Sequence, residues 1–235
     1  MGYEDRASSL TNNAQKFTMI FLKYLPFSLH WIIRRSIGNK NKTILDLGCG
    51  DGSFTRDISV GEDWQIIGLE LYENSIRQAK ELMIYNQVLK GDVTRIPRSI
   101  TSKKYDVVFL SQVIEHLPKS VGELALKRWE KLAKKKMIVT TPVGFMEFDR
   151  VEKRGMEENK LQKHLSGWKP EEFSKRGYKV YGQGVNFIYG KDGLVRKTHP
   201  IFWLVLILIS YLTSPIVYYF PKLGTYMVAV KPIKR

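Results

Sequence analysis

The chain has 235 residues, of which 43% are hydrophobic and 26% charged, a balance typical of a folded globular protein and not of a disordered one. Its 38 Lys and Arg against 23 Asp and Glu give a net charge of +15, which favours anionic partners such as nucleic acid, an anionic membrane surface or an acidic small substrate. Cys49 is the single cysteine, so an intrachain disulfide is excluded, which fits a reducing compartment. The N-terminus lacks the apolar core of a secretory signal, so we expect a cytoplasmic location.

Residues 14–38 are rich in large apolar residues, and their spacing predicts two short amphipathic helices broken near Pro26. Such helices either cap a core or lie in a membrane interface. Strand and helix signals then alternate, which implies a mainly parallel sheet with helices on both faces. The predicted strands occupy residues 43–47, 64–71, 87–93, 105–111, 136–142, 178–184 and 225–232. The predicted helices among them occupy residues 53–59, 73–85, 120–134 and 170–177.

A glycine-rich loop, GCGDG, follows the first predicted strand, where open α/β sheets bind ligands. Gly48, Gly50 and Gly52 can adopt positive φ and let a ligand approach the backbone. Their G-x-G-x-G spacing differs from the G-x-G-x-x-G that aims a helix N-terminus at a pyrophosphate. Taken alone, the loop fits a dinucleotide site or a tight turn as well.

Two carboxylates accompany this loop: Asp46 lies inside the preceding strand, and Glu70 ends the second strand. S-adenosylmethionine carries an ammonium and a sulfonium group, for which carboxylates are suitable partners. A carboxylate at Glu70 can also accept hydrogen bonds from both hydroxyls of a ribose. The same acid serves NAD sites, so Glu70 alone does not discriminate between the two cofactors.

The segments ILDLGCGDGSFT, IIGLELYENSIRQAK, KGDV and YDVVFLSQVIEHLP, in this order and spacing, resemble the successive motifs of class I S-adenosylmethionine-dependent methyltransferases. The resemblance covers roughly residues 40–184 and is to the small-molecule, lipid and glycan branch, methyltransferase type 11-like. It implies an α/β fold with a Rossmann-like, doubly wound, mainly parallel seven-stranded sheet and an antiparallel last strand. We therefore expect a single domain over residues 1–235, with residues 40–184 as its cofactor-binding core and S-adenosylmethionine as its cofactor.

The resemblance also implies a set of cofactor contacts. These are Asp46, Gly48, Cys49, Gly50 and Gly52 in the first motif, Glu70 and Leu71 in the second, Asp92 and Val93 in the third, and Ser111 and Gln112 in the fourth. In this scheme the first motif holds the methionine part, Glu70 the ribose and Asp92 the adenine amino group, while Ser111 and Gln112 lie under the methyl group. Two alternatives stay open: Asp92 as a turn residue, and Cys49 as a small buried filler instead of a nucleophile.

The sequence after the fourth predicted strand narrows the acceptor. It reads SQVIEHLP, where enzymes that methylate exocyclic base nitrogens carry an Asn/Asp-Pro-Pro-aromatic stretch. Cytosine-C5 enzymes need a Pro-Cys nucleophile, and the single cysteine lies elsewhere. We therefore expect no DNA substrate. A small-molecule, lipid or lipid-linked glycan acceptor is favoured, with RNA methylation as an alternative suggested by the basic charge.

Two histidines are candidate catalytic residues. His116 follows the fourth strand, and His164 lies in the long loop after the fifth, four residues before Trp168. His164 and Trp168 either form a pocket wall with a general base or merely pin the loop by packing and a hydrogen bond. His116 either acts in catalysis or caps a helix and orients Glu115. No metal ligand set is predicted.

Residues 201–220 carry no charge and as a helix would reach about 30 Å, the thickness of a bilayer core. Basic residues flank both ends, so both ends are expected on the cytoplasmic side. We predict that the hydrophobic insert, residues 185–224, attaches the protein to a membrane peripherally or monotopically through a helix, a turn at Ser214–Pro215 and a short second limb. The alternatives are a buried helical hairpin, which covers the sheet or makes a dimer, and a single transmembrane span if residues 225–232 lie outside the sheet. A non-catalytic, cofactor-binding membrane partner is a third function left open.

Overall fold

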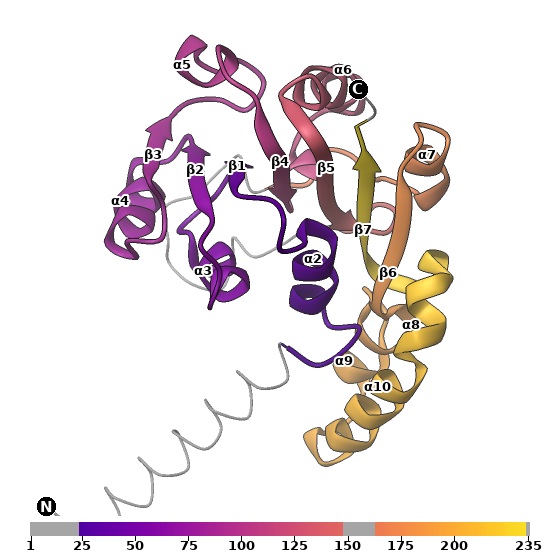
Figure 1. Cartoon of the computed structure of the whole chain (residues 1–235). Helices are drawn as coiled ribbons and strands as arrows, with labels where there is room; N and C mark the ends of the chain where they lie inside the picture. Colours follow the sequence, from indigo (N-terminus) through magenta and orange to yellow (C-terminus); the bar gives the residue numbers. More distant parts are fainter. Residues whose placement is uncertain (1–23, 148–162, 234–235) are drawn as a thin grey trace, which may run out of the picture.

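A computed structural model describes residues 24–147 and 163–233 of the chain. Its described part contains one seven-stranded sheet in the order β3-β2-β1-β4-β5-β7-β6 (Figure 1). The strands are β1 (Thr43–Leu47), β2 (Gln65–Glu70), β3 (Gln87–Lys90), β4 (Tyr105–Ser111), β5 (Ala133–Pro142), β6 (Lys179–Val185) and β7 (Gly224–Pro232). Strands β1 to β5 are parallel, and β7 runs antiparallel between β5 and β6. The predicted doubly wound, mainly parallel sheet with an antiparallel last strand is confirmed.

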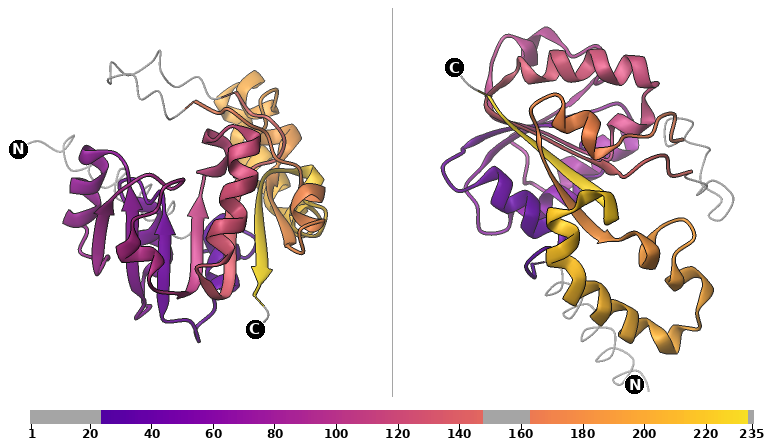
Figure 2. Two further views of the ribbon diagram at one scale, coloured as in Figure 1. Left: turned by 90° about the horizontal axis from the view of Figure 1, so that it is seen from above. Right: turned by 90° about the vertical axis from the view of Figure 1, so that its right-hand side faces the viewer.

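Helices lie on both faces of the sheet (Figure 2). The α-helices are α2 (Leu29–Ile37), α3 (Ser53–Ser59), α4 (Glu73–Glu81), α5 (Arg98–Thr101), α6 (Lys119–Glu130), α7 (Pro170–Ser174), α8 (Asn186–Tyr189), α9 (Leu194–Lys197) and α10 (Trp203–Tyr219). Short 3-10 turns are η1 (Ile114–His116), η4 (Pro200–Phe202) and η5 (Pro221–Leu223).

Alternation along the strands creates two separate cores. On one face, Ile44 of β1 and Phe109 of β4 pack with residues of α2 and α3. On the other face, Leu45 and Val108 pack with residues of α6, including the fully buried Trp129. Because neighbouring residues of one strand point to opposite faces, a single apolar run such as TILDL serves both cores.

Helix α2 covers the sheet. Ser28 caps its start by accepting a hydrogen bond from the backbone N–H of Trp31, at 3.2 Å. Its buried residues Ile32, Ile33 and Ile37 belong to the core on the α3 side. Of the two helices predicted over residues 14–38, this one therefore caps the core. The other falls largely on residues 14–23, which lie outside the described part of the chain.

Helix α10 corrects one prediction. The expected turn at Ser214–Pro215 was wrong, because a single helix runs through Pro215 to Tyr219. Proline lacks the N–H that would bond the carbonyl of Tyr211 four residues earlier. The Ser214 hydroxyl donates to that carbonyl at 2.6 Å, and the Thr213 hydroxyl donates to the carbonyl of Ile209 at 2.7 Å. These side-chain bonds satisfy carbonyls around the proline, so the helix continues.

Helix α10 is docked onto β6 at one point of very close approach. A Cβ atom at Gly182 would lie 2.3 Å from the carbonyl oxygen of Val217, so only glycine lets the two backbones meet. Tyr218 stacks on Tyr181 of β6, with ring centroids 4.6 Å apart, and its ring centroid also lies 5.4 Å from that of Phe27. The C-terminal half of α10 is therefore fixed to the sheet, and the helix extends past the sheet edge (Figures 1 and 2).

The chain returns from α10 into the sheet as β7, and Gly224 pairs with Val185 of β6. Both ends of the insert therefore belong to the same domain. A single transmembrane span was expected only if residues 225–232 lay outside the sheet, and they lie within it as β7. Among the residues that the structure describes, no helix combines the length and apolar character needed to cross a bilayer.

Candidate active site

A cavity of about 480 Å³ opens at the carboxyl ends of β1, β2, β3 and β4. It lies at the point where the strand order reverses between β1 and β4, the usual ligand position in open α/β sheets. Ten of the eleven predicted cofactor contacts line it, namely Asp46, Gly48, Cys49, Gly50, Glu70, Leu71, Asp92, Val93, Ser111 and Gln112. Its volume lies in the range of small-molecule sites.

The glycine-rich loop between β1 and α3 depends on backbone conformations that other residues rarely adopt. Gly48 and Gly50 have φ of 72° and 58°, and a Cβ at Gly48 would lie 2.6 Å from a methyl carbon of Val113. Gly52, the remaining predicted contact, does not line the cavity. It precedes α3 with φ of 77° and packs against the ring of Tyr85, where a Cβ would come within 2.9 Å.

Asp46 is fully buried in β1 beneath the cavity. One of its oxygens, Oδ2, accepts hydrogen bonds from the Thr55 hydroxyl at 2.7 Å and the Tyr85 hydroxyl at 2.8 Å. Burial raises the pKa of Asp46 to about 6, while these two hydrogen bonds oppose the rise. The carboxylate is thus held in place and is mostly charged at neutral pH.

Glu70 holds the glycine loop and the start of the next segment together. Its Oε2 accepts from the N–H of Gly50 at 2.9 Å, and its Oε1 accepts from the N–H groups of Leu71 at 2.8 Å and Tyr72 at 2.9 Å. A carboxylate offers about four acceptor positions, so one remains beyond these three. Glu70 therefore both shapes the cavity wall and presents negative charge to it.

Asp92 follows β3 and has the turn role that the sequence left open. Its Oδ1 accepts from the backbone N–H of Thr94 at 2.7 Å and from the Thr94 hydroxyl at 2.8 Å, closing an Asx turn. Both Asp92 and Val93 line the cavity, so the turn also places the carboxyl group at its rim.

The end of β4 carries a strained residue. Gln112 has φ of 56°, which is rare outside glycine and which the backbone bond from its N–H to the carbonyl of Thr140 supports at 3.0 Å. Its side chain donates to the Thr140 hydroxyl at 3.2 Å, and Ser111 shares that hydroxyl at 3.1 Å. The two polar side chains are thereby fixed where the cavity meets β5.

Cys49 behaves as a packing residue. Its sulfur lies where a Cβ on Gly68 would come within 2.8 Å, beside Tyr85. Burial raises the pKa of the thiol above its usual range, with further contributions from Asp46 and Glu70. The group stays protonated, which argues against a role as nucleophile.

The two candidate catalytic histidines lie together, although they are 48 positions apart along the chain. Their rings meet edge to face with centroids 4.8 Å apart. His116 lines the cavity, whereas His164 is buried behind it and shares a short hydrogen bond between its Nδ1 and the Met146 carbonyl. Burial lowers the pKa of His164, so its imidazole is neutral at neutral pH.

Glu115 lies beside both rings and is 1% exposed. Burial raises its pKa to about 8. Its backbone carbonyl accepts from the N–H groups of Leu165 at 2.8 Å and Ser166 at 3.0 Å, which attaches the His164 loop to η1. Trp168 is fully buried and bonds the Ser166 hydroxyl at 3.0 Å, so the predicted pinning of this loop by packing is present.

Sequence reasoning missed Tyr85 and Thr55, the two partners of Asp46. Residues 73–85 were predicted as one helix, but α4 ends at Glu81, and the positive φ of 53° at Met83 turns the chain back toward β1. Thr55 could have been found, because it stands nine residues after Asp46 in the helix that the glycine loop starts. Tyr85 carries no such signal.

The fold and the cavity define the chain as a Rossmann-like class I methyltransferase. Residues 38–176 match the methyltransferase domain family, and the chain belongs to that family, whose methyl donor is S-adenosylmethionine. An uncharacterized methyltransferase of Schizosaccharomyces pombe is 32% identical over 78 residues, 33% of this chain and 30% of that protein. Ubiquinone biosynthesis O-methyltransferase of Serratia proteamaculans is 29% identical over 99 residues, 40% of this chain and 39% of that one. The chain thus spans well under half the length of these curated relatives.

Solved structures agree on the fold. A TehB-like S-adenosylmethionine-dependent methyltransferase of Corynebacterium glutamicum has a TM-score of 0.52 at 14% identity, covering 97% of this chain and 100% of that one. A methyltransferase of Archaeoglobus fulgidus has a TM-score of 0.52 at 14% identity, covering 91% and 98%. Magnesium protoporphyrin IX methyltransferase of Synechocystis PCC 6803 has a TM-score of 0.50 at 12% identity, covering 100% and 89%.

Proposed function

We propose that this chain transfers a methyl group from S-adenosylmethionine, bound in the cavity at the ends of β1 to β4, to a small-molecule acceptor. The observation that carries the proposal is the pair of carboxylates, Asp46 and Glu70, at neighbouring strand ends around the glycine loop. A cofactor with two positive groups and no phosphate suits a cavity whose wall is acidic at this point. The membership in the methyltransferase domain family supports the same reading.

We propose that residues lining the cavity bind S-adenosylmethionine and orient it. Asp46 would face the positively charged methionine part, and Glu70 would offer its remaining acceptor position to the ribose. A bidentate grip on both ribose hydroxyls would require the bond from the Gly50 N–H to be given up. Leu71 and Val93 would pack on the adenine, with Asp92 at its amino group.

Methyl transfer is an in-line displacement at a carbon that the sulfonium already activates. The main tasks of the protein are therefore alignment and exclusion of water. A general base is needed only when the acceptor carries a proton of high pKa, as a hydroxyl does. His116, which lines the cavity, is placed to receive such a proton, and the ring of His164 packs against it edge to face.

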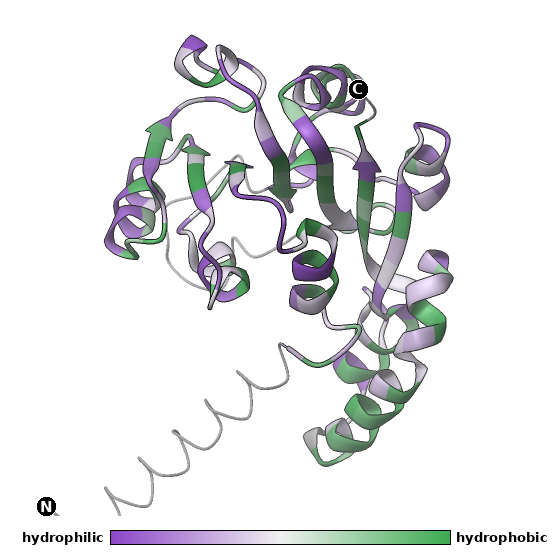
Figure 3. Ribbon diagram, in the orientation of Figure 1, coloured by the Kyte–Doolittle hydropathy of each residue, from purple (hydrophilic) through white to green (hydrophobic). Residues whose placement is uncertain are grey.

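We further propose that the acceptor is membrane-borne, a lipid or a lipid-linked glycan. The support is helix α10, which carries many strongly hydrophobic residues (Figure 3). We define the α10 apolar surface as the exposed residues Leu204, Val205, Ile207, Leu208, Ile209, Tyr211, Leu212 and Ile216. Its buried residues are Leu206, Ser210, Val217 and Tyr218, so most of its apolar side chains point to solvent. Exposed apolar surface of this extent marks an interaction site.

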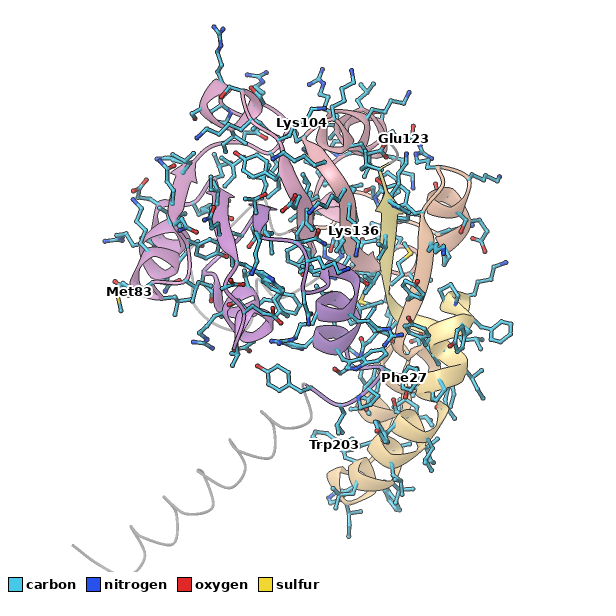
Figure 4. All side chains as sticks on the ribbon, viewed as in Figure 1. Phe27, Met83, Lys104, Glu123, Lys136 and Trp203 are labelled. Atoms are coloured by element: carbon cyan, nitrogen blue, oxygen red, sulfur yellow. The ribbon has the colours of Figure 1, made fainter. Side chains whose placement is uncertain are left out.

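An anionic membrane surface suits this helix better than a protein core. Trp203 at its start (Figure 4) and Tyr219 at its end are the residue types that favour a membrane interface. Arg196, Lys197 and Lys222 flank it and suit anionic headgroups. A helix of 17 residues is about 25 Å long, which suits one that lies in the interface.

A second cavity supports a route from this helix to the site. It has about 520 Å³ and lies between the end of β5 and the α8–α9 segment, with Phe145, Phe187 and Leu194 in its wall. Met146, also in this wall, is the residue whose carbonyl contacts His164. Helices α8 and α9 pack against each other, and Ile188 and Val195 pack with Leu206 of α10. An acceptor tail would thus run from the membrane side toward the histidines.

Methyl transfer is tested by incubating the full chain with S-adenosylmethionine labelled in its methyl group and a fractionated cell extract. Label in the organic phase supports a lipid or lipid-linked acceptor, and label in the aqueous small-molecule fraction supports methyl transfer without the membrane part. Label in RNA overturns the acceptor class. The Asp46→Asn/Glu70→Gln double variant is the control, and equal labelling by it contradicts the proposed site.

Membrane attachment is tested by flotation with anionic liposomes. The triple variant Leu204→Gln/Leu208→Gln/Leu212→Gln removes three side chains of the α10 apolar surface that are 78%, 57% and 67% exposed. We expect it to stay at the bottom of the gradient while the unchanged chain floats. A matched control replaces Val60, Met83 and Leu124, which are also exposed but lie elsewhere, by Gln. Equal flotation of both triple variants contradicts the proposal.

A further inference from the structure

We propose that Glu115, His116 and His164 bind one divalent metal ion of the zinc type beside the cofactor cavity. Each side chain offers one ligand atom, and these atoms lie within 4.8 Å of one another. In a tetrahedral zinc site with bonds of about 2.0–2.1 Å, ligand atoms stand about 3.4 Å apart. The three side chains therefore need to close by about 1.4 Å at most, which side-chain rotation can supply.

The hydrogen bonds of the two histidines select the tautomer that a metal needs. Nδ1 of His116 lies 3.2 Å from the carbonyl oxygen of Lys163, and Nδ1 of His164 contacts the carbonyl oxygen of Met146. A carbonyl oxygen only accepts, so each Nδ1 carries the hydrogen and each Nε2 carries the lone pair. A backbone carbonyl on the far ring nitrogen is the usual second contact of a metal-binding histidine.

Glu115 provides an independent reason for a cation. Both of its carboxyl oxygens are buried, and no hydrogen bond of normal distance and angle reaches either from the described residues, although the nearby Thr141 hydroxyl partly stabilises the ionised form. A buried carboxyl group without partners is costly, so such groups are normally hydrogen-bonded or coordinate a metal. The group lies next to two imidazole rings, and within residues 24–147 and 163–233 it forms no ion pair with a Lys or Arg. A metal ion would satisfy its oxygens.

The backbone around the three residues is held before any ion binds. The Glu115 carbonyl accepts from the N–H groups of Leu165 and Ser166, which fixes the His164 loop onto η1. The Ser166 hydroxyl donates to the carbonyl of Ile114 at 3.4 Å, and Trp168 anchors the same loop in the core. The ligands thus come from two segments far apart in the sequence that the fold keeps adjacent.

Two histidines and one glutamate form a ligand set of catalytic zinc sites, in which the fourth position stays open. His116 also lines the cofactor cavity, so the open position would be reached from the side where an acceptor binds. There the ion would coordinate an acceptor hydroxyl and lower its pKa. With the ion bound, the histidines are ligands and the ion takes over the activation of the acceptor, so the proton leaves to solvent. The oxygen lone pair would then bond the methyl carbon as the carbon–sulfur bond breaks to release S-adenosylhomocysteine. This role rests on the proposed function, whereas metal binding itself does not.

The test uses the full chain stripped with a chelator and titrated with Zn²⁺, Mn²⁺ and Mg²⁺ separately. Metal content after gel filtration gives the stoichiometry, and competition with a chromophoric chelator gives the affinity. We expect one Zn²⁺ per chain and weaker Mn²⁺ and Mg²⁺ binding, because imidazole ligands favour zinc.

Three variants assign the ligands. Glu115→Gln removes the charge at nearly constant volume, while His116→Asn and His164→Asn keep a donor near the Nδ1 position and remove Nε2. Each should lower the zinc affinity by more than about tenfold, the least that loss of even an outer partner produces. His199→Asn, on an exposed histidine, is the matched control. Circular dichroism checks that each variant folds, and any one folded variant suffices for the comparison.

Substoichiometric zinc in the unchanged chain, or an affinity that the folded variants share with it, overturns the metal site. Calorimetric uptake of S-adenosylmethionine is measured on the same samples without any acceptor. Normal cofactor uptake with no zinc binding rejects the metal site and leaves the proposed function standing. Zinc binding with no cofactor uptake rejects the proposed function and leaves the metal site standing.

Discussion

Two regions of the molecule differ in which side chains they bury. The first lies around β1 and β2, and the second lies around β6 and α10. In the first, the charged groups Asp46 and Glu70 are buried and tied down by hydrogen bonds. In the second, apolar side chains are exposed, and the helix is held by the close approach at Gly182 and by the packing of Tyr218 and Leu206. Buried charge and exposed apolar surface are both unfavourable without a partner. These two features are the basis of the two proposed partners, the positively charged S-adenosylmethionine and an apolar membrane surface.

The largest expected effect comes from disrupting the contact between β6 and α10. Gly182→Val places side-chain atoms where the Val217 carbonyl lies, so α10 must leave β6. We expect a loss of about 3 kcal/mol or more in the free energy of unfolding, the upper range for overpacking. Urea unfolding measures this loss, and proteolysis should cut within residues 191–223 more readily. Val60→Ala is the control, since this side chain is 58% exposed and lies outside β6 and α10. Unchanged protection of α10 contradicts the described docking.

The next largest effect is expected on cofactor affinity, from a substitution at Glu70. Glu70→Ala removes the acceptor of three backbone N–H groups as well as negative charge at the cavity wall. Loss of a charge-assisted hydrogen bond costs about 1.5–3 kcal/mol, so the affinity for S-adenosylmethionine should fall by about 10–150-fold. Titration calorimetry gives the number, with Glu81→Ala on the exposed side of α4 as control. A change below about threefold would show that Glu70 serves the loop alone.

The pH dependence sharpens the role of Asp46. Its pKa is about 6, and a cationic ligand prefers the ionised form, so affinity is lost as pH falls through 6. Between pH 7.5 and 5 the ionised fraction drops about tenfold, and the affinity should drop alike. The titratable groups facing Asp46 are Tyr85, Cys49 and Glu70. Asp46→Asn should bind weakly with a flat profile, and a tenfold fall retained in this variant rejects the assignment.

The smallest effect concerns the continuity of α10. Ser214→Ala removes the hydroxyl that satisfies the Tyr211 carbonyl opposite Pro215. We expect a loss of about 0.5–1.5 kcal/mol in the free energy of unfolding, the net value of one hydrogen bond. Ser214→Thr keeps the hydroxyl and should restore most of the loss. If the alanine variant is as stable as the unchanged chain, water replaces the bond at this exposed position.

The same contrast explains how much could be predicted. In the first region, the strand ends and the glycine loop follow each other in sequence, so the alternation of elements predicted the fold. The resemblance of these motifs to class I methyltransferases implied ten of the residues that line the cavity. Tyr85 was missed because a turn at Met83, and no periodicity, brings it to Asp46. The sequence therefore predicts a site residue when that residue belongs to one of the successive motifs. It does not predict a residue that a turn outside the motifs brings to the site.

For residues 201–220, the composition predicted an apolar helix, but the sequence did not show that this helix continues through Pro215. Pro215 was interpreted as a break, because the sequence does not show that Ser214 and Thr213 would satisfy the nearby carbonyls. The grouping of Glu115 with both histidines was missed for a similar reason. It requires the loop before α7 to bond the carbonyl of Glu115, a tertiary contact that no spacing along the chain reveals.

The pairing of Val185 with Gly224 has a practical consequence. Because these two residues are neighbours on adjacent antiparallel strands, a tight hairpin turn could join them directly in place of residues 186–223. Residues 186–223 could then be deleted, and every strand of the sheet would remain. Tyr181 and Phe27, which contact Tyr218 of α10, would be replaced by polar residues in the shortened chain. The shortened chain would separate methyl transfer from the proposed membrane attachment, so that each can be measured without the other.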